Sequence, residues 1–126
     1  MKRNTLLSTL WIFLVVNFIF CDVFTLFHSE SLKAVLTGEM DGMIISQEFL
    51  LAFAVIMELA MVMILLSRIL PYKINRTLNI VISAILAIIQ AWSLIGANTL
   101  HYYFFSAIEI TTCISIAIIA LKWRTI

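Results

Sequence analysis

Three carboxylic acids stand inside long apolar runs of this sequence: Asp22, Glu58 and Glu109. An ionisable side chain in hydrocarbon is costly, and it usually faces the interior of a helix bundle, a water-filled cavity or a partner. A mid-span acid costs about 3 kcal/mol on insertion scales, but each Leu, Ile, Phe or Val contributes about −0.3 to −0.6 kcal/mol, so the run around Glu58 still inserts. Two such acids could share a proton, or bind a cation or a basic ligand.

Two amides lie at similar depth to the acids. At a rise of about 1.5 Å per residue, Asn17, Asp22, Glu58, Gln90 and Glu109 all lie roughly 8–16 Å from the outer ends of their runs. We see no comparable polar set in the inner halves of the runs. We therefore predict one ligand-binding cavity in the outer half of the membrane, which Glu58 and Glu109 face, Gln90 and Asn17 line, and Asp22 borders at the mouth. The alternative is a neutral hydrogen-bonded network that fixes helix register.

Helical angles indicate which polar side chains point inward. At about 100° per residue, Ser106, Glu109 and Cys113 lie within about 60° of one another. Gln90 lies on a face of small residues against which another helix can pack closely. That face consists of Ser83, Ala87 and Ala91.

Asn17 and Asp22 lie about 140° apart on one helix and cannot both point along one bundle axis. One of them would then face a second subunit. Together with the small-residue face around Ala87, this favours a homodimer or a higher assembly.

Four elements must position these side chains. The apolar runs cover residues 5–27, 47–69, 77–97 and 101–121, and each has about the 20 residues that cross ~30 Å of hydrocarbon. They must be helical because lipid offers no partner to an open backbone group. The 63% hydrophobic content and 12% charged content are far from the roughly one quarter of charged residues in soluble domains. The predicted fold is all-α, one domain over residues 1–126, a transmembrane four-helix bundle.

The connections carry end signals. Pro71 ends the second run, Asn75 or Thr77 caps the third, and Gly96 terminates it. Asn98 or Thr99 caps the fourth run. The longest connection, residues 28–46, contains a short extracytoplasmic helix from the Ser cap at residue 29 to the stop at Gly38. This helix would lie over the bundle or at the interface; the alternative is an ordinary mobile loop.

Basic residues predict the orientation. Of eight Lys and Arg residues, all except Lys33 flank the two termini or the Pro71 connection. By the positive-inside rule, we predict a multi-pass membrane protein with both termini and the Pro71 connection in the cytoplasm.

Several classes of function lack support. With a net charge of +1, the chain lacks the strongly basic character that is typical of nucleic-acid-binding domains. We find no phosphate loop, nucleophile elbow or dinucleotide motif, so we predict no cofactor and assign no catalytic residue. His28 and His101 show no metal-ligand spacing, and Cys21 and Cys113 suit packing. These observations favour a protein that is not an enzyme, but they do not decide whether it has an enzymatic activity.

Three methionines surround Glu58: Met57, Met61 and Met63. Met fills irregular gaps in cores, and packing is one interpretation. A deformable apolar pocket beside an acid is the other.

A set of residues spread along the chain carries a family resemblance: Asn17 with Cys21-Asp22, Gly38, Glu58, Leu70-Pro71-Tyr72, Asn75-Arg76 and Glu109. In arrangement they resemble a family of small bacterial four-span membrane proteins of unknown function, which is similar in layout to the DoxX-like proteins. The resemblance implies a bacterial inner membrane and a four-helix bundle, and it carries over no activity. At fold level, some DoxX-like relatives are associated with quinone-linked redox steps, and four-span sterol isomerase-like proteins use buried acids on an apolar substrate.

Three functions compete. The first is binding or transport of a small apolar or protonatable ligand that enters from the outer leaflet. The second is a redox accessory or isomerase-like enzyme acting on a quinone- or lipid-like substrate. The third is a structural accessory subunit whose acids pair with polar groups of a partner. Membrane lipid surrounds the protein in all three.

Overall fold

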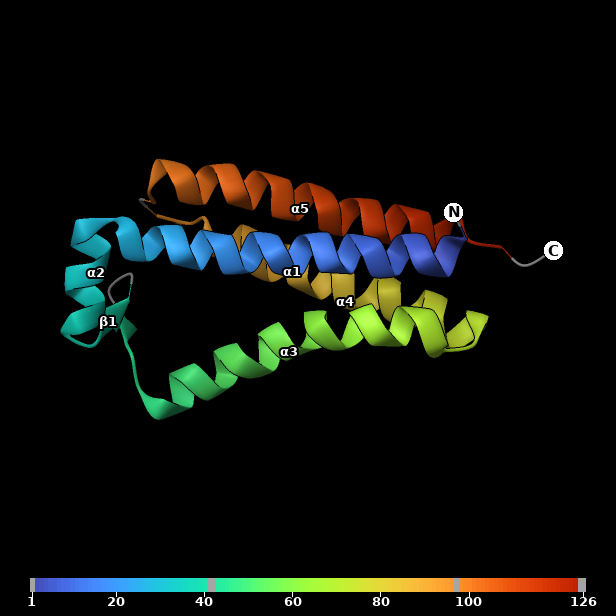
Figure 1. Cartoon of the computed structure of the whole chain (residues 1–126), viewed down its shortest axis with the longest axis horizontal. Helices are drawn as coiled ribbons and strands as arrows, with labels where there is room; N and C mark the ends of the chain where they lie inside the picture. Colours follow the sequence, from blue (N-terminus) through green and yellow to red (C-terminus); the bar gives the residue numbers. More distant parts are fainter. Residues whose placement is uncertain (1, 41–42, 97, 125–126) are drawn as a thin grey trace.

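The computed structural model describes residues 2–40, 43–96 and 98–124. Four long helices run side by side along its long axis (Figure 1). They are α1 (Arg3–Phe27), α3 (Gln47–Ile69), α4 (Tyr72–Ser93) and α5 (Leu100–Leu121). All four are long and apolar enough to cross a membrane. The predicted all-α fold with four membrane-length helices is confirmed.

A small substructure connects α1 to α3. It contains the short helix α2 (Ser29–Leu36) and an antiparallel pair of two-residue strands, β1 (Glu39–Met40) and β2 (Met43–Ile44). Figure 1 shows α2 across the end of the bundle opposite the two termini. None of its side chains is buried.

Helix α2 has a different N-cap residue from the predicted one, and it ends before the predicted Gly38. The helix is capped by the ring of His28, which accepts a hydrogen bond from the Ser31 N–H at 3.3 Å, whereas Ser29 was the predicted cap. Gly38 follows the helix with a φ of +87°, a conformation that glycine adopts without steric cost.

The start of α4 also differs from the prediction. The helix begins at Tyr72, directly after Pro71, rather than at residue 77. Asn75 does not cap it: the side chain is buried and donates a hydrogen bond of 2.7 Å to the carbonyl of Ser67. The amide thus satisfies a carbonyl in the last turn of α3, while α4 begins without a side-chain cap bond.

In the connection between α4 and α5, a predicted cap residue again bonds to the preceding helix. Helix α4 ends at Ser93, before Gly96, whose φ is +101°. Asn98 donates to the Leu94 carbonyl at 3.3 Å and so closes α4 rather than opening α5. Thr99 occupies the N-cap of α5 without a side-chain cap bond.

The core lies in the half of the bundle that holds the termini. Leu7, Trp11, Met63 and Ile116 are fully buried there. The fully buried residues of α3 all lie in its second half: Ala60, Met63 and Ser67. Toward its N-terminal end α3 diverges from α1 (Figure 1). The opposite half of the bundle is therefore less closed.

A buried polar network in the half near the termini overturns one prediction. Trp11 Nε1 donates to Asn79 Oδ1 at 2.7 Å, and Ser67 Oγ donates to the same oxygen at 3.3 Å. Asn79 Nδ2 donates to Asn75 Oδ1 at 2.6 Å. The prediction of a single polar set, confined to the outer half, is wrong. Neutral amides and hydroxyls can satisfy one another in a low-dielectric interior, so they need neither charge nor water there.

Candidate functional site

Glu109 on α5 is the most unusual side chain of the fold. It is 1% exposed, and neither carboxylate oxygen has a hydrogen-bond partner among the described residues. Ser106 and Cys113 are buried on the same face of α5, as the helical angles predict. The oxygens of a carboxyl group accept hydrogen bonds in either protonation state, and a buried polar group without a partner is costly. The Glu109 oxygens therefore lack a donor among the described residues.

Glu109 lines a small cleft between the helices, which we call the acid cleft. Its volume is about 50 Å³. The other lining residues are Phe18, Cys21 and Asp22 of α1, Phe53 and Met57 of α3, Gln90 of α4 and Tyr102 of α5. The cleft lies where α3 diverges, since α3 has no buried residue before Ala60.

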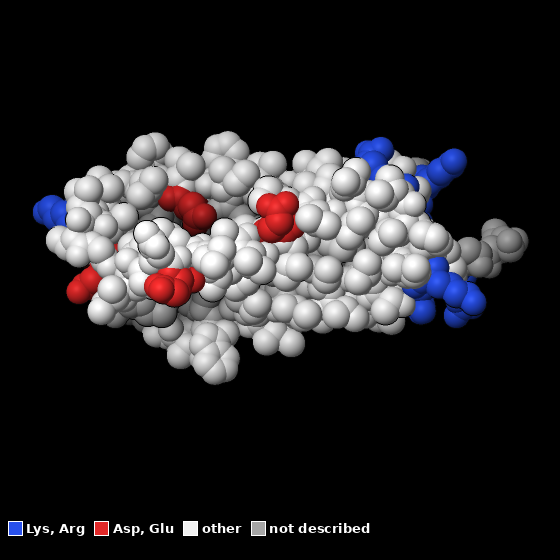
Figure 2. Space-filling model, turned by 90° about the horizontal axis from the view of Figure 1, so that it is seen from below, with Lys and Arg blue, Asp and Glu red and all other residues white. Residues whose placement is uncertain are grey.

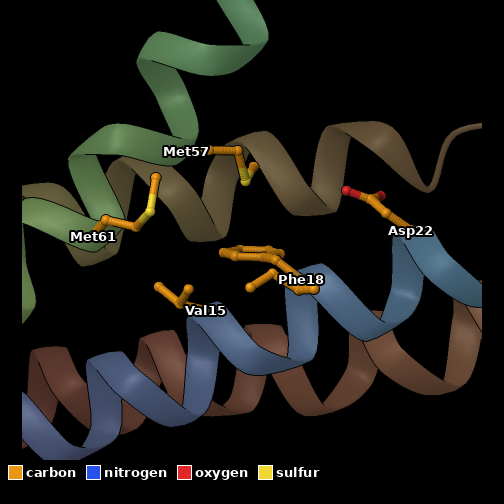
Figure 3. Close-up of a pocket in the computed structure, with 6 residues that line it drawn as sticks. Val15, Phe18, Asp22, Met57 and Met61 are labelled. Carbon is orange, nitrogen blue, oxygen red and sulfur yellow. The ribbon is translucent and has the colours of Figure 1, made fainter.

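Asp22 stands at the edge of the acid cleft. Its side chain is exposed, although it lines the same cleft as the buried Glu109. Figure 3 shows its carboxylate extending from α1 into the space beside α3. The predicted role of Asp22 at the mouth of a ligand-binding cavity stays a prediction.

Gln90 reaches the acid cleft from α4 and is fixed there by α5. Its Nε2 donates a hydrogen bond of 2.7 Å to Ser106 Oγ. Tyr102, also in the lining, donates its hydroxyl hydrogen to Ser93. These contacts join α4 to α5 beside Glu109. Gln90 faces the protein, as its position on the small-residue face of α4 predicts.

The structure places the other two predicted residues elsewhere. Asn17 is buried but donates to the carbonyl of Phe13 on its own helix, and it is absent from the lining of the acid cleft. Glu58 is exposed, and the described ranges give its carboxylate no hydrogen bond or ion pair. The prediction that Glu58 and Glu109 face one shared cavity is therefore wrong. The reason is angular: Glu58 lies about 180° around α3 from the buried Ser67.

A second cleft continues from the first, and we call it the apolar cleft. It has a volume of about 100 Å³ and lies between α1 and α3 (Figure 3). Its lining consists of Val15, Phe18, Ile19, Asp22, Met57 and Met61. Phe18, Asp22 and Met57 line both clefts. Of the three methionines around Glu58, Met63 packs in the core and the other two border this cleft.

Charge is unevenly distributed along the bundle. On the face seen in Figure 2, most Lys and Arg side chains gather at the end with the termini and one lies at the opposite end, while the acids lie from the middle of the bundle to that opposite end. Within the described ranges, no three His, Cys, Asp or Glu side chains are grouped so that they could hold a metal ion. His101 Nε2 instead lies at hydrogen-bond distance, 3.1 Å, from Thr25 Oγ1, and this contact joins α5 to α1.

Comparison with known proteins places the chain in a family. The model of the DUF6326 family, a family of unknown function, matches residues 1–126. The chain belongs to this family. No curated protein and no solved structure matches it. The layout shared with DoxX-like proteins accordingly stays a prediction for this DUF6326 protein, as does its bacterial inner-membrane location.

The aromatic part of the cleft in this DUF6326 protein was not predicted from the sequence. Phe18, Phe53 and Tyr102 line it, and each belongs to an apolar run in which aromatic residues are common. One signal was readable: Phe18 and Asp22 are four residues apart and so share a face of α1. Phe53 lines the cleft because α3 diverges, and nothing in its neighbourhood in the sequence indicates that divergence.

Proposed function

We propose that this protein binds a small cationic or protonatable ligand in the acid cleft. The observation that carries the proposal is Glu109, which is buried with both carboxylate oxygens unpartnered among the described residues. Such a group loses about 1–3 kcal/mol or more relative to a hydrogen-bonded one. A ligand N–H or ammonium group supplies the missing donor. Asp22, at the edge, brings a second carboxyl group to the same cleft.

The lining favours an organic cation. Phe18, Phe53 and Tyr102 bring aromatic rings to the same cleft as the two acids. Ring faces attract ammonium groups by about 0.5–2 kcal/mol, and more when water is excluded. An alkylammonium ion therefore matches both the charge and the apolar lining.

The position of the cleft in the membrane is part of the proposal. The termini share one end of the bundle (Figure 1), and the basic side chains gather there (Figure 2). The positive-inside rule puts that end in the cytoplasm. The acid cleft then lies in the outer half of the bacterial inner membrane, where it receives ligands from the outer leaflet. A complete carrier would need a second subunit, because four helices enclose little volume.

Thermal unfolding of the purified protein in a neutral detergent tests the proposal. Butylamine at neutral pH should raise Tm by a few degrees, because a ligand that binds only the folded state stabilises it. Butanol should not, since it lacks the charge. Glu109→Gln should abolish the response. Glu58→Gln should retain it, because Glu58 lies outside the cleft.

Two results would contradict the proposal. An equal response to butanol would indicate a site for neutral molecules, as the quinone- or lipid-directed enzyme requires. A response to butylamine that survives Glu109→Gln would place the amine elsewhere.

A second role, in assembly, is favoured by the exposed Glu58. Its carboxyl lies among lipid-facing apolar residues of α3: Leu51, Val55, Val62 and Leu65. A homodimer that pairs α3 with α3 would bring the two Glu58 side chains together. Two identical chains inserted in the same direction place α3 parallel to itself, and a neutral carboxylic acid is both a donor and an acceptor.

A further inference from the structure

We propose that the ligand is a single-chain primary amine carried by the bilayer. Its ammonium group would occupy the acid cleft, and its alkyl chain would lie in the apolar cleft between α1 and α3. This inference rests on the proposed function and names the class of ligand for the same site.

The first argument is continuity. The acid cleft and the apolar cleft share Phe18, Asp22 and Met57 in their linings. A molecule whose head lies beside Glu109 can therefore extend past Asp22 toward Met61 without crossing a helix (Figure 3). The polar groups are at one end of this path and the apolar side chains are along the rest of it.

The second argument is size. The acid cleft has about 50 Å³ and the apolar cleft about 100 Å³. Both are well below the roughly 300 Å³ of a pocket that encloses a whole small molecule. The space admits a small head and a few methylene groups of one chain, and the rest of the chain stays in lipid. Met57 and Met61 are flexible side chains that can adjust to such a chain.

The third argument is access. In the described structure, α3 buries no residue before Ala60, so the space between its first half and α1 opens sideways. Asp22, on the rim of that space, is exposed. The surroundings at this depth are hydrocarbon, because both helices are long and apolar enough to cross a membrane. The ligand would thus enter from the bilayer rather than from water.

Hydrogen bonding restricts which head groups suit the acid cleft. A primary ammonium has three N–H donors. They suit the carboxylate of Asp22 and the two Glu109 oxygens, which have no hydrogen-bond partner in the described part of the chain. A quaternary ammonium has no N–H donor and is larger. A phospholipid with an amine head would add a phosphate next to two acids, and it carries two chains.

The test is photocrosslinking with a dodecylamine that carries a diazirine in mid-chain, followed by mass spectrometry of the purified protein. Labelling should concentrate on the two stretches around Val15 and Met61, which line the apolar cleft. Excess dodecylamine should reduce that labelling at least tenfold. Dodecanol and dodecyltrimethylammonium should compete much less.

A matched pair of variants separates this inference from the proposed function. Met61→Trp fills the apolar cleft without touching the acid cleft, and it should weaken dodecylamine binding about tenfold while butylamine binding is unchanged. Val16→Trp, at a lipid-exposed position next to the cleft, should change neither. Labelling spread over all lipid-facing surfaces, or equal dodecylamine binding by Met61→Trp, would overturn the tail site alone. If butylamine does not raise the Tm of the wild-type protein, the proposed function itself is overturned.

Discussion

The three intramembrane acids of this chain have the same chemistry but different surroundings. Glu109 is buried with no hydrogen-bond partner among the described residues, Asp22 lies at the rim of the acid cleft, and Glu58 is exposed on α3. Their presence inside apolar runs is visible in the sequence, and the inward face of α5 follows from helical angles. The outward direction of Glu58 follows from the same rule once the small residues Ala60 and Ser67 are taken as the packed face of α3. On α3, the acid Glu58 is thus a weaker indicator of the inward face than Ala60 and Ser67 are.

Removal of the Glu109 carboxyl should separate stability from binding. In Glu109→Leu, a buried group without a hydrogen bond becomes an apolar one of similar size, so we expect the free energy of unfolding to rise by about 1–3 kcal/mol. Binding of amines should be lost at the same time. Thermal unfolding in detergent without and with butylamine measures both. A lower Tm in Glu109→Leu would mean that the carboxyl is bonded within the fold.

Helix ends and helix directions were not equally predictable. Helix α3 has the predicted bounds because the length of an apolar run is set by the thickness of the bilayer and because Ser46 caps it, accepting from the Phe49 N–H. The start of α4 was missed because Asn75 bonds to the preceding helix. The divergence of α3 was missed as well, since it depends on packing between distant segments. The candidate cleft exists because of that divergence, so the sequence predicted its polar residues better than its shape.

The polar network near the termini should stabilise the contacts of α1 and α3 with α4. Asn79→Leu leaves the Trp11 Nε1–H without its acceptor and Asn75 Oδ1 without its donor, so we expect a loss of about 1–3 kcal/mol in unfolding free energy. Trp11→Phe in the same background should cost less than it does alone, because the shared hydrogen bond is already gone. Unfolding of the two single variants and the double variant provides the measurement. Strict additivity would show that the bond between Trp11 and Asn79 contributes nothing.

The orientation of the whole bundle can be tested with reporters. If both termini are cytoplasmic, a phosphatase that is active only outside the inner membrane should be inactive when fused to the C-terminus. The same reporter inserted beside Lys33, in the segment at the opposite end, should be active. Reversed activities would reverse the membrane depth assigned to the acid cleft. Its neighbours within the fold would remain the same.

Assembly is the largest-scale consequence of the position of Glu58. We expect a dimer in native mass measurements from a mild detergent, because pairing removes a mid-membrane acid from lipid, where it costs about 3 kcal/mol on insertion scales. Glu58→Gln should preserve the dimer, since an amide both donates and accepts, whereas a hydrophobic replacement should not. Glu58→Leu should therefore shift the protein toward monomer. Ala91→Leu is the matched test of the other candidate surface, because Ala91 is exposed at the end of the small-residue face of α4. If only Ala91→Leu dissociates the dimer, α4 forms the interface. If the wild-type protein is monomeric, Glu58 faces lipid without a partner subunit and the predicted dimer is wrong.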